Sequence, residues 1–333
     1  MFKIKSLLLV SLLLYSTAHF GQFTDVINSN RPGESMAAFS VGKTVFQAEL
    51  GMYGFKEKHD LLNYEASGFG SNLDFRYGAI LEQLEFIVNF QYQYENFTAP
   101  LVNGNQSGFK KTIIGAKFLV YDPIKKYIEK PNLYSWKANH KFSYRQFIPA
   151  VGVYAGLNIN LSDNTFIRPQ IPNDPNISPK FMVLTQNQFG KFVLCTNIIL
   201  DKFPSDKKSI DYVVTLTRGF NSRWSGFLEN QGFKGDYYSD AIFRTGAAFL
   251  VKQNIQIDAS IGVNYKDTPS VLAGGVGLSW RFDKNYSEVL YRIPKDKDKG
   301  KDKKKSKADK KKDKKKEKDK KRLDDIESTP LQP

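Results

Sequence analysis

The chain has 333 residues, of which 41% are hydrophobic and 14% aromatic, and its formal net charge is +15. Its single cysteine, Cys195, excludes an intramolecular disulfide and a zinc site built from several cysteines. After the N-terminal stretch, no segment approaches the roughly 20 consecutive apolar residues that a membrane-spanning helix needs. Any insertion into a membrane is therefore expected to use strands.

The first residues have the pattern of a secretory signal peptide. Lys3 and Lys5 form a short basic start, and residues 6–18 form an apolar stretch of the length expected for the core of a signal. We place cleavage between Gly21 and Gln22, so that residues 1–21 are the signal. Residues 22–42 then look irregular and polar, and we expect them to form a periplasmic N-terminal segment.

A series of segments alternates between apolar and polar residues. In residues 255–264, Ile257 and Ile261 would face one side and Asp258 the other, because successive side chains of a strand point to opposite faces. One face suits lipid and the other water. The expected strands cover residues 43–55, 71–77, 84–94, 110–121, 147–161, 179–189, 191–200, 209–220, 223–231, 240–251, 254–265 and 271–282. The sequence predicts an all-β protein, an antiparallel transmembrane outer-membrane β-barrel of about 12 strands over residues 43–282.

The connections between these segments follow the pattern of bacterial barrels, which have short periplasmic turns and longer external loops. Short joins are expected at residues 78–83, 190, 221–222 and 252–253, and longer loops at residues 56–70, 98–108 and 162–178. The connection 122–146 breaks the pattern, because it should be a short turn and is long, basic and aromatic. It is either a helical insertion at the membrane interface or in the lumen, or residues 134–144 form a further strand.

The barrel is expected to end at Phe282, because alternation stops there and charged sequence follows. Trp280 and Phe282 would then form the aromatic closing signal of the last strand. Residues 283–333 lack the apolar residues that a core needs, so we expect a disordered, lysine-rich tail in the periplasm. Most of the net charge lies in its residues 295–322.

The tail could bind the cell wall, anionic lipid headgroups or an envelope protein complex through its charge, or it could be a solvated extension without a partner. Its candidate partner-binding residues are Lys303, Lys304, Lys305, Lys310, Lys311, Lys312, Lys314, Lys315 and Lys316. Nucleic acid is not expected as a partner, because the chain is exported.

Several short motifs carry a resemblance to a known family. They are Asn30-Arg31-Pro32-Gly33, residues 41–43, residues 47–51, residues 256–262 and residues 280–282. With these motifs, the chain resembles the outer-membrane barrels of the transporter family of the phenol-degradation meta-pathway type, over about residues 28–282. The resemblance implies a barrel embedded in outer-membrane lipid and a transporter-like function.

Ionisable residues of both signs fall on the face that would line the lumen. They are Glu49, Asp74, Arg76, Glu85, Glu229, Arg244, Asp258 and Arg281. A water-filled passage could use such groups to select solutes. The favoured alternative is that these groups pair across a narrow lumen and close it, as side chains fill the interior of small barrels.

Enzymatic chemistry has little support. The three histidines, His19, His59 and His140, lie in the signal, in an expected loop and in the anomalous connection, so no Ser-His-acid arrangement is expected, and neither is a metal or a cofactor. The leading hypothesis is a transporter-like or channel barrel for small solutes in the outer membrane of a Gram-negative bacterium. The alternative is a non-conducting subunit of an envelope machine for protein assembly or secretion, which docks its partners through the loops or the tail.

Overall fold

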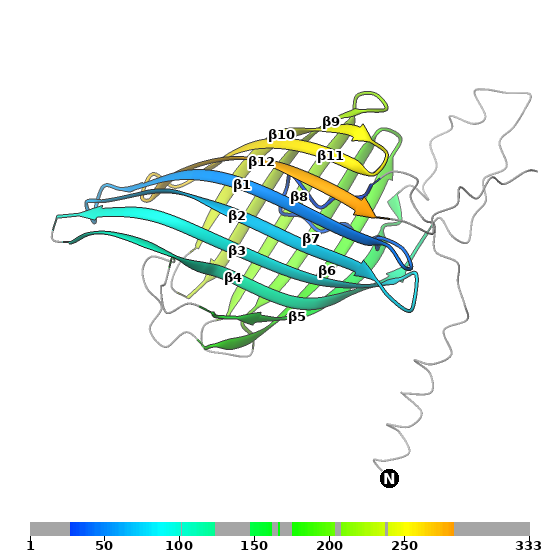
Figure 1. Cartoon of the computed structure of the whole chain (residues 1–333), viewed down its shortest axis with the longest axis horizontal. Helices are drawn as coiled ribbons and strands as arrows, with labels where there is room; N and C mark the ends of the chain where they lie inside the picture. The colour runs from blue at the N-terminus through cyan, green and yellow to red at the C-terminus, as the bar shows by residue number, and fades with distance from the viewer. Residues whose placement is uncertain are drawn as a thin grey trace, which may run out of the picture. The chain divides into compact units, whose positions relative to one another are not determined.

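The computed structural model describes residues 27–100, 102–123, 147–161, 166, 175–203, 208–236 and 239–282. Within these residues, twelve antiparallel strands form a closed barrel in which every strand pairs with its neighbours in sequence (Figure 1). The strands are β1 (Phe46–His59), β2 (Tyr64–Gly78), β3 (Leu84–Ala99), β4 (Val102–Tyr121), β5 (Ala150–Ile159), β6 (Ile177–Phe189), β7 (Phe192–Asp201), β8 (Ser209–Gly219), β9 (Trp224–Gly235), β10 (Ser239–Lys252), β11 (Ile255–Asn264) and β12 (Ser270–Phe282). The predicted fold class and strand number are confirmed.

The barrel closes between its first and last strands. β1 pairs with β12 from Phe46 opposite Phe282 to Lys58 opposite Ser270. The last strand therefore ends at the predicted residue. Trp280 and Phe282 point outward, with 41% and 47% of their surface exposed, and their ring centroids lie 5.8 Å apart.

The two faces of the wall are also those expected from the alternation. On β1, Gln47 and Glu49 are completely buried, whereas Leu50 and Met52 are exposed. Exposed apolar side chains on the outside of a closed barrel have no protein to pack against, so this surface suits lipid. In the described part of the chain, no helix has both the length and the apolar character needed to cross a membrane.

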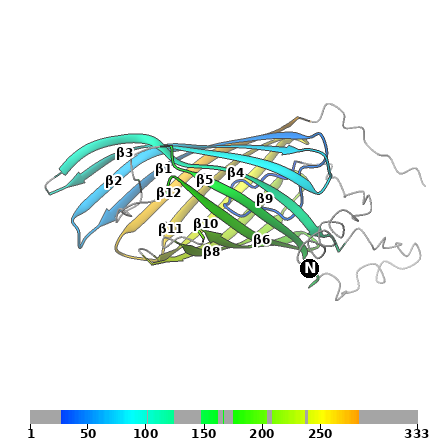
Figure 2. The same ribbon diagram turned by 90° about the horizontal axis from the view of Figure 1, so that it is seen from below.

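The expected long loops at residues 56–70 and 98–108 are wrong. β1 and β2 continue to residues 59 and 64, and β3 and β4 continue to residues 99 and 102, so both connections are short. Figure 2 shows these four strands extending beyond the others. Glycine and asparagine favoured loops in the sequence, but here they lie in paired strands, with Gly70 opposite Gln93 and Asn105 opposite Asn96.

Four predicted regions lie wholly or mostly outside the described residues: the signal peptide, the connection 122–146, the loop 162–178, and the tail at 283–333 with its lysines. The strands on either side of the connection nevertheless show how many strands the described barrel has at this point. β4 pairs directly with β5 from Ile113 opposite Asn158 to Tyr121 opposite Val151. The described barrel therefore closes with no further strand between them.

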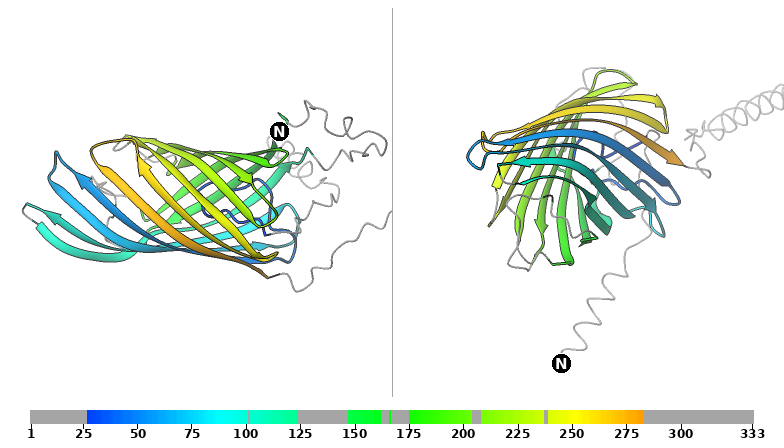
Figure 3. Two further views of the ribbon diagram at one scale, coloured as in Figure 1. Left: turned by 90° about the horizontal axis from the view of Figure 1, so that it is seen from above. Right: turned by 60° about the vertical axis from the view of Figure 1, so that its left-hand side comes forward.

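The N-terminal segment departs from its expected periplasmic position. Residues 27–45, hereafter the luminal segment, run inside the barrel, where Figure 3 shows them in dark blue. The segment enters where Ile27 N donates to Gln253 O (2.8 Å) in the β10–β11 turn, and it leaves where Thr44 N donates to Gly78 O (2.7 Å). Its irregular, polar sequence suggested exposure to water, but the polar inner wall offers it the same hydrogen bonds.

Candidate functional site

A buried network of charged side chains lies beside Asn28, near the start of the luminal segment. Arg76 donates to Glu49 over 2.9 Å and to Glu85 over 2.5 Å, and Lys117 lies 3.1 Å from Glu85, all four side chains being completely buried. Charges in such surroundings are stable only when they are paired and hydrogen-bonded. Arg76 also donates to the carbonyl oxygen of Asn28 over 2.7 Å, so the network holds the luminal segment as well.

A second ion pair, between Arg244 and Glu229, holds the middle of the segment. The Glu229 carboxylate also accepts hydrogen bonds from the backbone N–H of Glu34 (3.0 Å) and from the Thr215 hydroxyl (2.7 Å). Gly33 lies so close to this carboxylate that a Cβ atom at residue 33 would overlap it. The glycine of the Asn30-Arg31-Pro32-Gly33 motif therefore allows the backbone to approach Glu229.

Arg31 of the same motif lies flat against the wall. Its guanidinium forms an ion pair with Asp258 at 3.1 Å, and a Cβ atom at Gly51 or Gly277 would overlap it. Gln256 donates to the Arg31 carbonyl oxygen over 3.2 Å. The sequence motifs on β1, β11 and the N-terminal segment are thus parts of one contact.

The second half of the segment is held through its main chain. Asn197 accepts from Met36 N over 2.6 Å and donates to Met36 O over 2.9 Å. Lys117 donates to the carbonyl oxygens of Ala37 (3.0 Å) and Phe39 (2.9 Å), and Gln186 accepts from Ala38 N over 3.1 Å. Polar wall side chains thereby satisfy backbone groups that have no strand partner.

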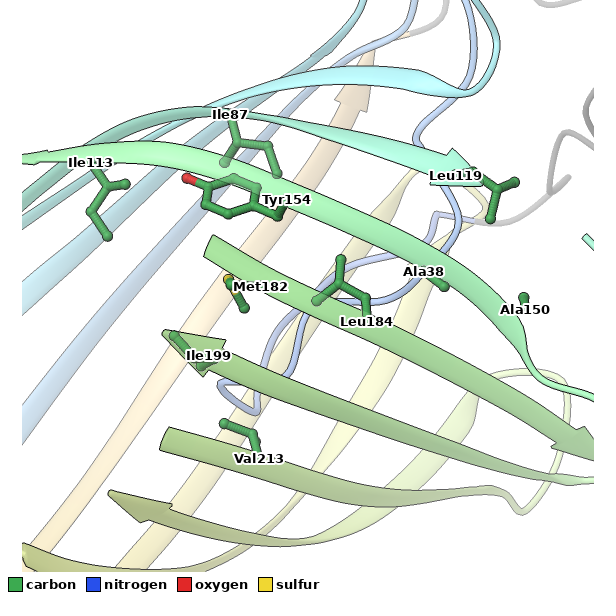
Figure 4. Close-up of a cluster of buried hydrophobic side chains, with 10 residues drawn as sticks. All are labelled: Ala38, Ile87, Ile113, Leu119, Ala150, Tyr154, Met182, Leu184, Ile199 and Val213. Atoms are coloured by element: carbon green, nitrogen blue, oxygen red, sulfur yellow. The ribbon is translucent and has the colours of Figure 1, made fainter. Parts of the chain in front are cut away.

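An apolar patch covers one side of the inner wall, on β3 to β8 (Figure 4). Ala38 of the luminal segment belongs to it, and Met36 and Phe39 pack against it. The other members are Ile87, Ile113, Leu119, Ala150, Tyr154, Met182, Leu184, Ile199 and Val213. This side of the interior is therefore largely apolar, although Glu85, Lys117 and Lys180 are also buried on β3, β4 and β6.

Three cavities lined by described residues lie beside the luminal segment. The outer cavity, about 220 Å³, reaches from Arg31 to Glu57 and Glu95 near the long hairpins. The central cavity, about 190 Å³, lies between the apolar patch and polar residues such as Asn72 and Asp74. The inner cavity, about 220 Å³, lies near the short turns. Arg31 lines all three.

The sequence profile of a family described as "Putative MetA-pathway of phenol degradation" matches residues 29–282. The chain belongs to this family. The matched range begins in the luminal segment and ends at the last residue of β12, so it includes the segment together with the whole barrel. With its closed barrel and apolar outer face, this family member is an outer-membrane protein.

Solved structures similar to this chain are also outer-membrane barrels. An outer-membrane channel from Pseudomonas putida F1 superposes with a TM-score of 0.50 at 9% identity, over 76% of this chain and 100% of that chain. The translocator domain of the autotransporter NalP from Neisseria meningitidis gives 0.43 at 8% identity, over 76% and 90%. The monoaromatic hydrocarbon channel CymD gives 0.41 at 9% identity, over 73% and 90%. No curated protein matches the chain by sequence.

All eight ionisable residues predicted to face inward lie on the inner wall. Glu49, Arg76, Glu85, Glu229, Asp258 and Arg281 are buried, whereas Asp74 and Arg244 border the cavities. Asp74 accepts a hydrogen bond from Asn89 over 2.5 Å. Arg76 pairs with Glu49 and Glu85, and Arg244 pairs with Glu229, but these pairs join neighbouring strands of the wall and do not cross the lumen. They do not fill the lumen, because the cavities remain.

The residues of the luminal segment and several of its wall partners were not predicted as site residues. Asp258 pairs with Arg31, which had been placed in the periplasm, and Lys117, Asn197 and Gln186 were given no role. In the sequence, the Asn30-Arg31-Pro32-Gly33 motif was the feature that could have indicated this contact, because it combines an arginine, which needs an acidic partner when buried, with a glycine, which permits close approach of the backbone. Within the described residues, no group of three potential ligands could hold a metal ion.

Proposed function

We propose that this barrel is an outer-membrane channel that passes small solutes through its lumen, past the luminal segment. The observation that carries the proposal is the set of three cavities inside the barrel, all of which Arg31 lines. The family match and the likeness to an outer-membrane channel support it. Neither the family nor that structure favours a non-conducting subunit of an envelope machine.

The cavities limit the size of the solute. A cavity of about 150 Å³ accommodates one benzene molecule. The central cavity, about 190 Å³, therefore has room for a molecule with a single ring. Its lining combines apolar side chains such as Ile113 and Met182 with polar and charged ones such as Asn72, Asp74 and Lys180. We infer that the solute is small, with an apolar body and a polar group.

Solute flux into proteoliposomes tests this function. We expect phenol-sized solutes and glycerol to enter faster than into liposomes without protein, and a trisaccharide to be excluded. Entry rates equal to those of protein-free liposomes for every solute would refute the proposal.

A matched pair of variants tests the role of the apolar patch. Ile113 is 6% exposed and faces the central cavity, whereas its neighbour Ile114 is 48% exposed on the outer face. Ile113→Ala is expected to lower the flux of ring-bearing solutes relative to glycerol, because it removes apolar contacts from the passage. Ile114→Ala removes the same atoms from the lipid-facing side and should leave the ratio unchanged.

A further inference from the structure

The inner wall contacts the luminal segment in an unusual way, because it binds mainly the backbone. Along its middle, wall side chains form hydrogen bonds with N–H or C=O groups of Glu34, Met36, Ala37, Ala38 and Phe39. In the described residues, no backbone-to-backbone bond joins residues 28–41 to a strand. The segment is therefore held as a bound peptide is held, and not as a strand of the sheet.

Two side-chain requirements give this binding its register. Arg31 lies where a Cβ atom at Gly51 or Gly277 would displace it, beside Asp258, and a Cβ atom at residue 33 would displace the Glu229 carboxylate. Asn30 Oδ1 accepts from Ala37 N over 3.2 Å, which closes a loop within the segment itself. These features fix where the segment lies, while the wall side chains satisfy its backbone.

The contacts also allow the segment to leave. Several of these hydrogen bonds involve the charged groups of Lys117 and Glu229, which hold the segment more tightly than neutral partners do, but water entering the lumen can replace each of them when the segment withdraws. The segment is anchored at both ends at the same rim of the barrel, through Ile27 at Gln253 and Thr44 at Gly78. Its middle could withdraw toward that rim without breaking a strand pair. Withdrawal would widen the lumen at Arg31, because that side chain lines all three cavities.

We propose that the inner wall is a peptide-binding site and that the luminal segment is its removable occupant. When bound, the segment narrows the passage, and when displaced, it leaves the passage wide. The effect on the passage rests on the proposed channel function, whereas the binding site does not.

The test uses the full chain with residues 28–41 deleted and a fluorescent synthetic peptide of residues 27–42. Fluorescence anisotropy in detergent measures binding. We expect saturable binding to the deletion variant and none to the wild-type protein, whose site is occupied. The same peptide carrying Gly33→Leu should bind at least about tenfold more weakly, because its side chain would overlap the Glu229 carboxylate. Equal binding of both peptides, or no binding, would overturn the proposal.

Conductance in planar bilayers separates this proposal from the channel function. We expect the deletion variant to conduct more than the wild type and the added peptide to reduce its current. Peptide binding without any conductance would support the binding site and reject the channel. Conductance that the peptide leaves unchanged, together with absent binding, would reject the binding site and leave the channel.

A second variant covers the case in which the deleted chain does not insert. Asp258→Asn in the full chain removes the charge that holds Arg31 at 3.1 Å. We expect a glutamate-specific protease to cleave after Glu34 faster in this variant than in the wild type, because the segment leaves the lumen more often. Equal cleavage rates would contradict the proposal.

Discussion

Replacing Arg76 by alanine should destabilise the barrel strongly. The side chain is completely buried and donates to Glu49, Glu85 and the carbonyl oxygen of Asn28. Removing one partner of a buried ion pair costs about 3–5 kcal/mol, because the other charge stays buried. Lys117 still lies 3.1 Å from Glu85, which compensates in part, so we expect a loss near the lower limit, about 3 kcal/mol.

Urea unfolding in detergent micelles, followed by tryptophan fluorescence, measures this loss. With a slope of about 2 kcal/mol per molar urea, a loss of about 3 kcal/mol lowers the midpoint by about 1.5 M. Arg218→Ala is the matched control, because Arg218 is exposed and its guanidinium lies 5.1 Å from the centroid of the Phe192 ring. That contact contributes about 0.5–1 kcal/mol. Equal midpoints for the two variants would refute the assignment of a buried, ion-paired Arg76.

Three further perturbations test the wall, its end and the contact between Gly277 and Arg31. Val88→Arg should lower the free energy of unfolding by about 2–4 kcal/mol if residue 88 lies near the membrane midplane. Asn89 borders the central cavity, so Asn89→Arg should lower it much less. Equal losses in the urea assay would reject the assignment of Val88 to the lipid-facing side and of Asn89 to the lumen. Removal of residues 283–333 should leave a heat-modifiable barrel in the outer membrane, because β12 ends at Phe282. Failure of this variant to insert despite normal export would show that the barrel does not end at Phe282. Gly277→Ala should displace the Arg31 guanidinium and raise the conductance of the barrel. Gly262→Ala is the control and should leave the conductance unchanged, because its Cβ would lie 3.4 Å from Arg244 Cγ. Identical currents from the two variants would exclude a role for Gly277 in holding Arg31.

The strands could be predicted because lipid on one side and a polar lumen on the other impose strict alternation. This constraint located the first residue of β3 at Leu84 and the last residue of β12 at Phe282, and it assigned the inner and outer faces of β1 correctly. It no longer applies where β1 to β4 extend beyond the other strands. Gly70 and Asn105 therefore looked like loop residues, although both lie in paired strands.

The inward direction of the ionisable residues could be predicted from the same alternation, but their partners could not. Arg31 and Asp258 are 227 residues apart in sequence, and alternation contains no information about which distant groups meet. The position of the luminal segment was missed for a related reason. Its backbone is satisfied by Asn197, Gln186 and Lys117, which lie on three different strands, and no local pattern marks such contacts.

The central claim is that this barrel conducts through a lumen that the luminal segment narrows. Its most direct test is the single-channel conductance of the wild-type protein and of the variant lacking residues 28–41, both heat-modifiable, in the same planar bilayer system. We expect small, reproducible steps from the wild type and larger steps from the variant. The absence of steps from both proteins would contradict the claim.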